Sequence, residues 1–127
     1  MRWSFWCYTS RTGRRVVEEW LDSVPASAQA NYTAIKRRLK LLQEWPEPAF
    51  RKLRGRNYSG LGEIRFSDDD NVQYRLIGYH SSESRFVILI GCTHKQRRYN
   101  PTNALETAVK RKKQVAKGKV SLHEEDS

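Results

Sequence analysis

The hydrophobic repeat of this chain changes once along its length, and this change constrains the fold more than any other feature. In the first part, apolar residues recur at intervals of four, three, four and three, which is the spacing of one helix face. These residues are Ala28, Tyr32, Ile35, Leu39 and Leu42. After two prolines the repeat becomes alternating, and strands are predicted at residues 61–66, 72–79 and 85–93. Hairpin-sized gaps separate these strands, so a mainly antiparallel sheet is expected.

Segments on both sides of this region complete the predicted order of elements. Residues 3–8 are aromatic and predict a first strand, and Thr12 is placed to cap a helix that runs to about Asp22. Asn100 followed by Pro101 is typical of a helix start, and a last helix is expected to follow it. The predicted order is β-α-α-β-β-β-α. It is an α+β fold in which two N-terminal helices cover one face of a small sheet and a C-terminal helix follows the sheet.

The length of the chain suits one domain with one hydrophobic core. Of its 127 residues, 38% are apolar and 11% are aromatic, which is enough for a core without disulfides or a structural metal. We expect this domain to span residues 1–117. Residues 118–127 carry Glu124, Glu125 and Asp126 against a single lysine, and they predict a flexible acidic tail.

A strongly positive charge limits the classes of partner. The net charge is +10, from 24 Lys and Arg against 14 Asp and Glu. This charge favours a polyanion, with nucleic acid ahead of an anionic membrane surface. No apolar run approaches the ~18 residues that span a bilayer, and the N-terminus has no signal-peptide pattern. Cys7 and Cys92 lack the spacing of a disulfide or metal motif, so a cytoplasmic protein with buried thiols is expected.

Alternation along the predicted strands gathers part of this charge on one face of the sheet. Arg65, Arg75 and Gln73 share the face away from the two N-terminal helices, together with Glu63. A five-residue turn between the strands would place Glu63 directly opposite Arg75. That pair also fits a purely structural contact worth ~0.2–1 kcal/mol, so both roles of Arg75 stay open. Arg65 has no evident acidic partner on its face, which favours a functional role.

Further polar residues are expected to border this face. They are Lys52, Arg54 and Arg56 in the preceding loop, and His94, Lys95, Arg97, Arg98 and Tyr99 at and after the end of the last strand. The basic run at residues 36–40 is more typical of a solvated helix face than of a binding site. A lone histidine is usually structural, but His94 lies among cations and an aromatic residue, so both readings stay open.

The chain lacks the short motifs of nucleotide-binding loops, zinc proteases and serine hydrolases. Its three histidines have no metal-ligand spacing, so neither a metal nor a cofactor is expected. RNA cleavage needs neither, because the 2′-hydroxyl of RNA is itself a nucleophile. Arginine stabilises phosphate charge, histidine or lysine transfers protons, and tyrosine stacks on a base. These residue types are present, although a non-catalytic RNA-binding protein would have the same composition.

Four segments, in their order along the chain, resemble a known group of toxins. They are VVEEWLDSVP, FRKLRGRNYSGLGEIRF, VQYRLIGY and FVILIGCTHKQRRYNPTNALETAVKRK. In this order they are similar to the RelE/ParE toxin superfamily, and within it to the HigB-like, phage-derived Gp49-like branch. The resemblance covers about residues 3–117 and implies the RelE-like fold.

The resemblance implies the toxin of a type II toxin–antitoxin system, an mRNA interferase. Such toxins cut mRNA on the ribosome without a metal ion, and a cognate antitoxin, here expected to be of the helix-turn-helix type, neutralises them. The motifs imply catalytic roles for Arg65, Arg75 and Lys95, with His94 beside them as a further candidate. The residues expected to bind RNA are Lys52, Arg54, Arg56, Gln73, Arg97, Arg98 and Tyr99.

The chain departs from the family pattern at two positions. Gln96 stands where a second lysine is usual, and Thr93 stands where phenylalanine is usual. Two other functions stay open beside the ribonuclease. ParE relatives use the same fold to inhibit gyrase, so the fold does not determine the target. A phage-derived member could also bind nucleic acid without cutting it.

Overall fold

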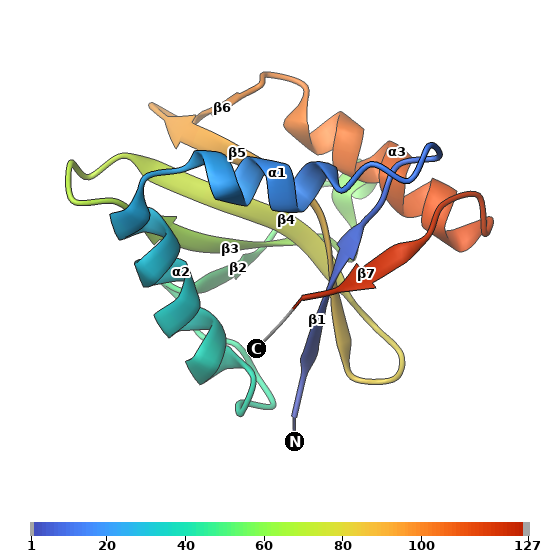
Figure 1. Cartoon of the computed structure of the whole chain (residues 1–127), viewed down its shortest axis with the longest axis horizontal. Coiled ribbons are helices and arrows are strands. Elements are labelled where there is room, and N and C mark those ends of the chain that lie inside the picture. Colours follow the sequence, from blue (N-terminus) through green and yellow to red (C-terminus); the bar gives the residue numbers. More distant parts are fainter. Residues whose placement is uncertain (1, 126–127) are drawn as a thin grey trace.

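The computed structural model describes residues 2–125 as an α+β fold with three α-helices and one open, mixed sheet of seven strands (Figure 1). The helices are α1 (Val16–Ser23), α2 (Ala26–Leu39) and α3 (Ala104–Ala116), and a short 3₁₀ turn, η1, covers Arg56–Tyr58. The strands are β1 (Ser4–Tyr8), β2 (Phe50–Lys52), β3 (Gly62–Ser67), β4 (Gln73–Ser81), β5 (Arg85–Lys95), β6 (Arg98–Asn100) and β7 (Leu122–Glu124).

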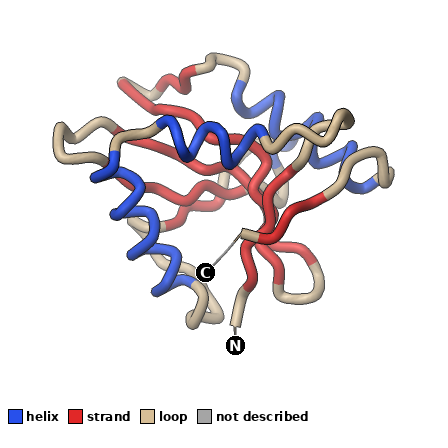
Figure 2. Tube along the Cα trace, in the orientation of Figure 1, coloured by secondary structure: helices blue, strands red, loops and turns tan. Residues whose placement is uncertain are grey.

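The sheet has the strand order β2-β3-β4-β5-β1-β7, and β6 also pairs with β5 (Figure 2). The pair β1–β5 is parallel, and the other pairs are antiparallel. The predicted α+β class and mainly antiparallel sheet are therefore confirmed. The hairpins β3–β4 and β4–β5 occupy the centre of the sheet, and a short turn joins the two strands of each hairpin.

Helices cover both faces of the sheet. On one face Trp20 of α1 packs against Phe66 and Tyr74, with ring centroids 6.4 and 6.1 Å apart. Gly91 in β5 lies beneath the same indole, where any side chain would collide with the Trp20 ring. On the other face the Lys112 ammonium of α3 lies 4.9 Å from the ring centroid of Tyr79. Tyr74 and Tyr79 lie five positions apart on β4, so their side chains point to opposite faces of the sheet. Helix α3 therefore covers the face opposite the one that α1 and α2 cover.

An aromatic cluster closes one end of the face that α1 and α2 cover. Phe86 is completely buried and contacts the rings of Phe5, Phe50 and Trp45, with centroids 4.9–6.0 Å apart. His80 in β4 packs its ring edge-on against Trp45 and Phe86, with centroids 4.4 and 5.0 Å away. One side of the imidazole stays exposed.

We expect His80 to make the stability of the fold depend on pH. Partial burial of its ring, and secondarily the charge of Lys52, lower its pKa from 6.5 to about 4. The unfolded chain therefore takes up a proton on His80 first, so the free energy of unfolding falls as the pH drops from 6.5 to about 4. Below that range both states are protonated and His80 contributes no further loss. Urea titrations at several pH values in this range should show a smaller loss of the free energy of unfolding in His80→Asn than in the wild-type protein. Equal losses in the two proteins would contradict this prediction.

The first two helices differ from their predicted limits at one end each. Helix α1 begins at Val16 and not near Thr12, because Gly13, with φ of 85°, forms a turn closed by its N–H donating to the Ser10 carbonyl. Helix α2 ends at Leu39, so Leu42 leaves the predicted apolar face and is exposed. An indole completes this helix end, because Trp45 Nε1 donates to the carbonyl of Leu39 at 2.9 Å.

Three short strands were not predicted, and α3 begins later than the predicted start at Asn100 and Pro101. Residues 50–52, 98–100 and 122–124 form β2, β6 and β7, and each is too short to show an alternating pattern. Asn100 is the last residue of β6 and not a helix cap, and α3 begins at Ala104. Strand β7 corrects the prediction of a flexible tail at residues 118–127, because residues 122–124 pair with β1. The last two residues of that predicted tail lie outside the described residues.

Candidate functional site

The register of β3 and β4 differs by two residues from the predicted one. Arg65 lies directly opposite Arg75, and Glu63, which was predicted to face Arg75, lies opposite Ile77. A shift of two residues leaves every side chain on its predicted face, because side chains alternate with a period of two. Glu63, Arg65 and Arg75 therefore share one face, as predicted, with Glu63 diagonal to Arg75.

The turn between these strands explains the shift. The Asp68 carboxylate accepts hydrogen bonds from the backbone N–H groups of Asp70 and Val72, both at 2.9 Å. Tyr74 also donates its hydroxyl to this carboxylate, at 2.8 Å. Asp68 thus holds Val72 inside the turn, and strand pairing begins one residue later, with Ser67 opposite Gln73.

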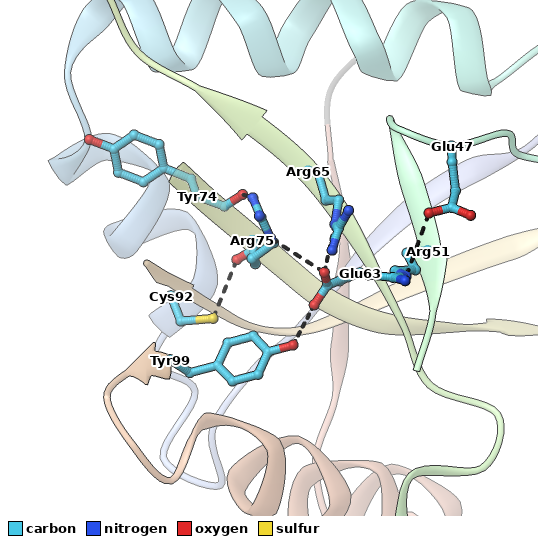
Figure 3. Close-up of polar contacts among 8 residues, drawn as sticks. All are labelled: Glu47, Arg51, Glu63, Arg65, Tyr74, Arg75, Cys92 and Tyr99. Carbon is cyan, nitrogen blue, oxygen red and sulfur yellow. Dashed lines mark hydrogen bonds and ion pairs between the residues drawn. The ribbon is translucent and has the colours of Figure 1, made fainter. Parts of the chain in front are cut away.

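Glu63 is the centre of a buried network on this face (Figure 3). Its Oε2 accepts a hydrogen bond from Arg65 Nε at 2.7 Å and lies 3.3 Å from Arg75 Nε. Its Oε1 accepts the hydroxyl of Tyr99 at 2.6 Å. The Glu63 side chain is only 2% exposed, so this carboxylate depends on its three partners. Arg65, for which no acidic partner was predicted, is bound by the carboxylate two residues before it.

The two arginines differ in accessibility. Arg75 is 7% exposed at its side chain, against 23% for Arg65. Arg75 Nη1 donates to the carbonyl of Tyr74 at 2.9 Å. Burial, and then the charge of Arg65, lower the pKa of Arg75, while Glu63 acts in the opposite direction. Arg65 is therefore the more accessible donor, and Arg75 lies behind it as a fixed positive charge.

A row of three polar side chains crosses β4, β5 and β6 beside the arginines. His94 lies opposite Gln73 on one side and opposite Tyr99 on the other. The His94 and Tyr99 rings meet edge to face, with centroids 4.8 Å apart. Burial and the charges of Arg75 and Arg65 lower the pKa of His94, so its imidazole is neutral at neutral pH and able to accept a proton.

Arg65 and Arg75 also border a groove between α2 and the C-terminal end of β3. Its lining includes Arg38 of α2 together with Arg65, Gln73 and Arg75, and we call it the arginine groove. No Asp or Glu occurs among its described lining residues. A groove lined by three guanidinium groups is suited to an anion with several oxygens, such as a phosphate.

The structure does not bring Lys95 into this cluster. It follows His94 on β5 and therefore points to the opposite face, where it lies across from Arg98 on β6. Arg97 occupies the turn between these two strands with φ of 65° and is exposed, as Arg98 is. These three cations form an exposed cluster where β5 turns into β6.

The cations predicted from the loop before β3 also lie elsewhere. Lys52 and Arg54 line a separate pocket with Trp45 and His80, and Arg56 is exposed in η1. On β2 it is Arg51 that lies opposite Glu63, and it pairs with Glu47 at 3.5 Å (Figure 3). Of the predicted site residues, the structure thus gathers Arg65, Arg75, Gln73, His94 and Tyr99.

Two members of the site have roles that the sequence pattern did not indicate. Arg38 belongs to a basic run that was interpreted as a solvated helix face, and its place in the groove follows from how α2 docks beside β3. Glu63 was considered only as a partner for Arg75, whereas it also binds Arg65 and Tyr99. Its sequence signal was a carboxylate two residues before Arg65 on the same predicted face of the strand.

Within residues 2–125, none of the helices is long and apolar enough to cross a membrane. No group of three or more His, Cys, Asp or Glu side chains in that range is arranged to hold a metal ion.

Comparison with known proteins identifies the family. No curated protein and no solved structure matches the chain. One family does match, over residues 19–113, and it is described as phage derived protein Gp49-like (DUF891). This range is more than half of the chain and contains α2, the central hairpins, the arginine groove and most of α3. The chain therefore belongs to the phage-derived Gp49-like family, in the HigB- and RelE-like branch of toxins.

Proposed function

We propose that this protein is the toxin of a type II toxin–antitoxin system and acts as a metal-independent endoribonuclease. It cuts mRNA on the ribosome, in the cytoplasm, and a cognate antitoxin neutralises it. One observation carries this proposal: Arg65 and Arg75 lie directly opposite each other, beside the row that contains His94, and border a groove whose described lining residues include no Asp or Glu. Membership in the Gp49-like family supports the toxin class.

The chemistry follows from the positions of these groups. The 2′-oxygen of RNA forms a bond to the adjacent phosphorus while the bond from phosphorus to the 5′-oxygen breaks. Neutral His94 accepts the proton of the 2′-hydroxyl, and the leaving 5′-oxygen takes a proton from water. Arg65 and Arg75 stabilise the additional negative charge that develops on the phosphoryl oxygens.

Glu63 positions the arginines for this role. It binds Arg65 through Nε, which fixes the guanidinium and leaves its terminal nitrogens for a ligand. It also holds Tyr99 beside His94, so one carboxylate orients groups from β3, β4 and β6. Such prior orientation reduces the reorganisation that charge stabilisation would otherwise need.

The test is the rate of mRNA cleavage in a cell-free translation reaction, measured by mapping new 5′ ends. We expect Arg65→Ala to lower this rate by about 10²-fold, the usual effect of removing one donor to a developing oxyanion. The fold should persist, because Glu63 keeps Tyr99 and Arg75 as partners. Circular dichroism checks that the variant is folded.

Arg51→Ala is the matched control. Arg51 lies on the neighbouring strand, is half-exposed and does not line the arginine groove, so its loss should change the rate by less than about twofold. Equal rates for Arg65→Ala and the wild-type protein would contradict the assignment of the site. Binding of RNA without any cleavage, even with translating ribosomes, would instead identify a non-catalytic nucleic-acid-binding protein.

A further inference from the structure

A second basic pocket lies on the other side of α2, away from the arginine groove. Its volume is about 510 Å³, within the range of ligand sites. Four cations line it: Arg2, Lys36, Arg37 and Lys40. Glu125, directly after β7, is the one acidic residue among its described lining residues. We call this site the tail pocket, because the C-terminal segment supplies its carboxylate.

The tail pocket already holds an oxyanion, the carboxylate of Glu125. Lys36 Nζ donates to Glu125 Oε1 at 2.7 Å, and the two side chains are only 8% and 12% exposed. The Tyr32 hydroxyl donates to the same carboxylate at 3.0 Å. The backbone N–H of Glu125 donates to the carbonyl of Phe5 at 2.8 Å, which anchors the segment to β1. An ammonium and a hydroxyl are thus fixed in positions that bind a negatively charged group.

Among the described residues, two carboxylates act on the four cations of the pocket: Glu125, which lines it, and Glu124, whose charge also reaches Lys40. Arg2 and Arg37 are exposed, and Lys40 is half-buried. Burial, and then the charges of Lys36 and Arg2, lower the pKa of Lys40, whereas Glu125 and Glu124 act in the opposite direction, so the cations repel one another more than the carboxylates offset. A ligand with more negative charge than a carboxylate would relieve this repulsion.

We propose that the tail pocket binds a phosphate group of an RNA strand, and that Glu125 competes with it for the same cations. Arg37 faces the tail pocket, whereas the next residue, Arg38, faces the arginine groove, so α2 carries cations on both sides. A strand bound in the arginine groove can therefore cross α2 and place a second phosphate in the tail pocket. The inference shares with the proposed function the assumption of an RNA partner, but it does not require cleavage.

The test measures binding of a labelled single-stranded RNA with 2′-O-methyl groups, which cannot be cut by attack of the 2′-oxygen. Fluorescence anisotropy follows its affinity for the full-length protein. We expect Arg37→Ala/Lys40→Ala to weaken binding about tenfold and to reduce the slope of log affinity against log salt by about 0.7, the value for one lost phosphate contact on a single strand. We expect Glu125→Gln to strengthen binding about threefold, because it removes the competing charge and keeps an acceptor for Lys36.

Two matched controls separate the pocket from the overall charge. Arg11→Ala/Arg15→Ala removes two exposed cations at the other end of β1 and should change the salt slope by less than about 0.2. Glu124→Gln removes the exposed neighbouring carboxylate of the same segment, which acts on Lys40 more weakly than Glu125 does, and should strengthen binding by less than about 1.5-fold. Circular dichroism of every variant checks folding.

The outcomes distinguish this inference from the proposed function. Binding that depends on Arg65 but not on Arg37 and Lys40 overturns the tail pocket as an RNA site and leaves the ribonuclease proposal intact. Equal effects of Glu125→Gln and Glu124→Gln overturn the competition. Absence of RNA binding, combined with binding of an oligoglutamate peptide that needs Arg37 and Lys40, overturns the RNA partner for both proposals.

Discussion

Replacement of Glu63 by alanine is expected to lower the free energy of unfolding by about 3–5 kcal/mol, the usual cost of removing one member of a buried ionic cluster. The carboxylate is almost completely buried and binds Arg65, Arg75 and Tyr99. Its removal leaves Arg75, which is 7% exposed, as a buried positive charge without a counterion among the contacts described for it. Urea denaturation of the wild-type protein and the variant at neutral pH measures the loss.

Glu47→Ala is the matched control for Glu63→Ala. Glu47 also pairs with an arginine, Arg51 at 3.5 Å, but its side chain is 65% exposed. Exposed pairs contribute little, so the control should change the free energy of unfolding by less than about 0.5 kcal/mol. A Glu63→Ala protein as stable as the control would show that the network does not hold this face of the sheet together.

Replacement of Phe86 by alanine is expected to cost about 3–5 kcal/mol of the free energy of unfolding. Phe86 is fully buried and contacts aromatic side chains from β1, β2 and the segment before β2. Its loss creates a cavity among rigid rings, which cannot move together to fill the space. Thermal and urea unfolding should both show this loss of the free energy of unfolding. The same strands should still pair in the folded variant.

Leu41→Ala is the control for this second prediction. Leu41 lies just after α2 and is 61% exposed, so its truncation removes little buried surface. We expect a change of less than about 0.5 kcal/mol. A Phe86→Ala protein that loses as little as the control would mean that the aromatic cluster is not part of the cooperative core.

The parts of the candidate site that were predicted depend on strand parity alone. Arg65 and Arg75 were placed on one face because side chains alternate along a strand, and that placement survived a register error of two residues. Their exact partners depend on the register, which the Asp68 turn decides. The Glu63–Arg65 pair was not foreseen because Glu63 was assigned to Arg75 alone, although residues i and i+2 of one strand share a face in any register.

Contacts between elements distant in sequence were not predictable in this way. Arg38 reaches the arginine groove because α2 docks beside β3, and Glu125 reaches Lys36 because β7 pairs with β1. No local pattern encodes either contact. Residues 118–127 are mostly polar, so by composition they resemble a flexible chain end.

The sequence by itself determined the central elements, the α+β class and which side of each strand its charges occupy. Those properties follow from the hydrophobic repeat, which is two residues in a strand and 3.6 in a helix. Each segment shows this repeat in its own sequence, without reference to the segments it packs against. The tertiary structure alone decided which charges meet: Glu63 with three partners, Arg38 with the sheet arginines, and Glu125 with Lys36. Those contacts depend on how whole elements pack, because burial makes an ion pair strong only after the fold has excluded water from both of its members.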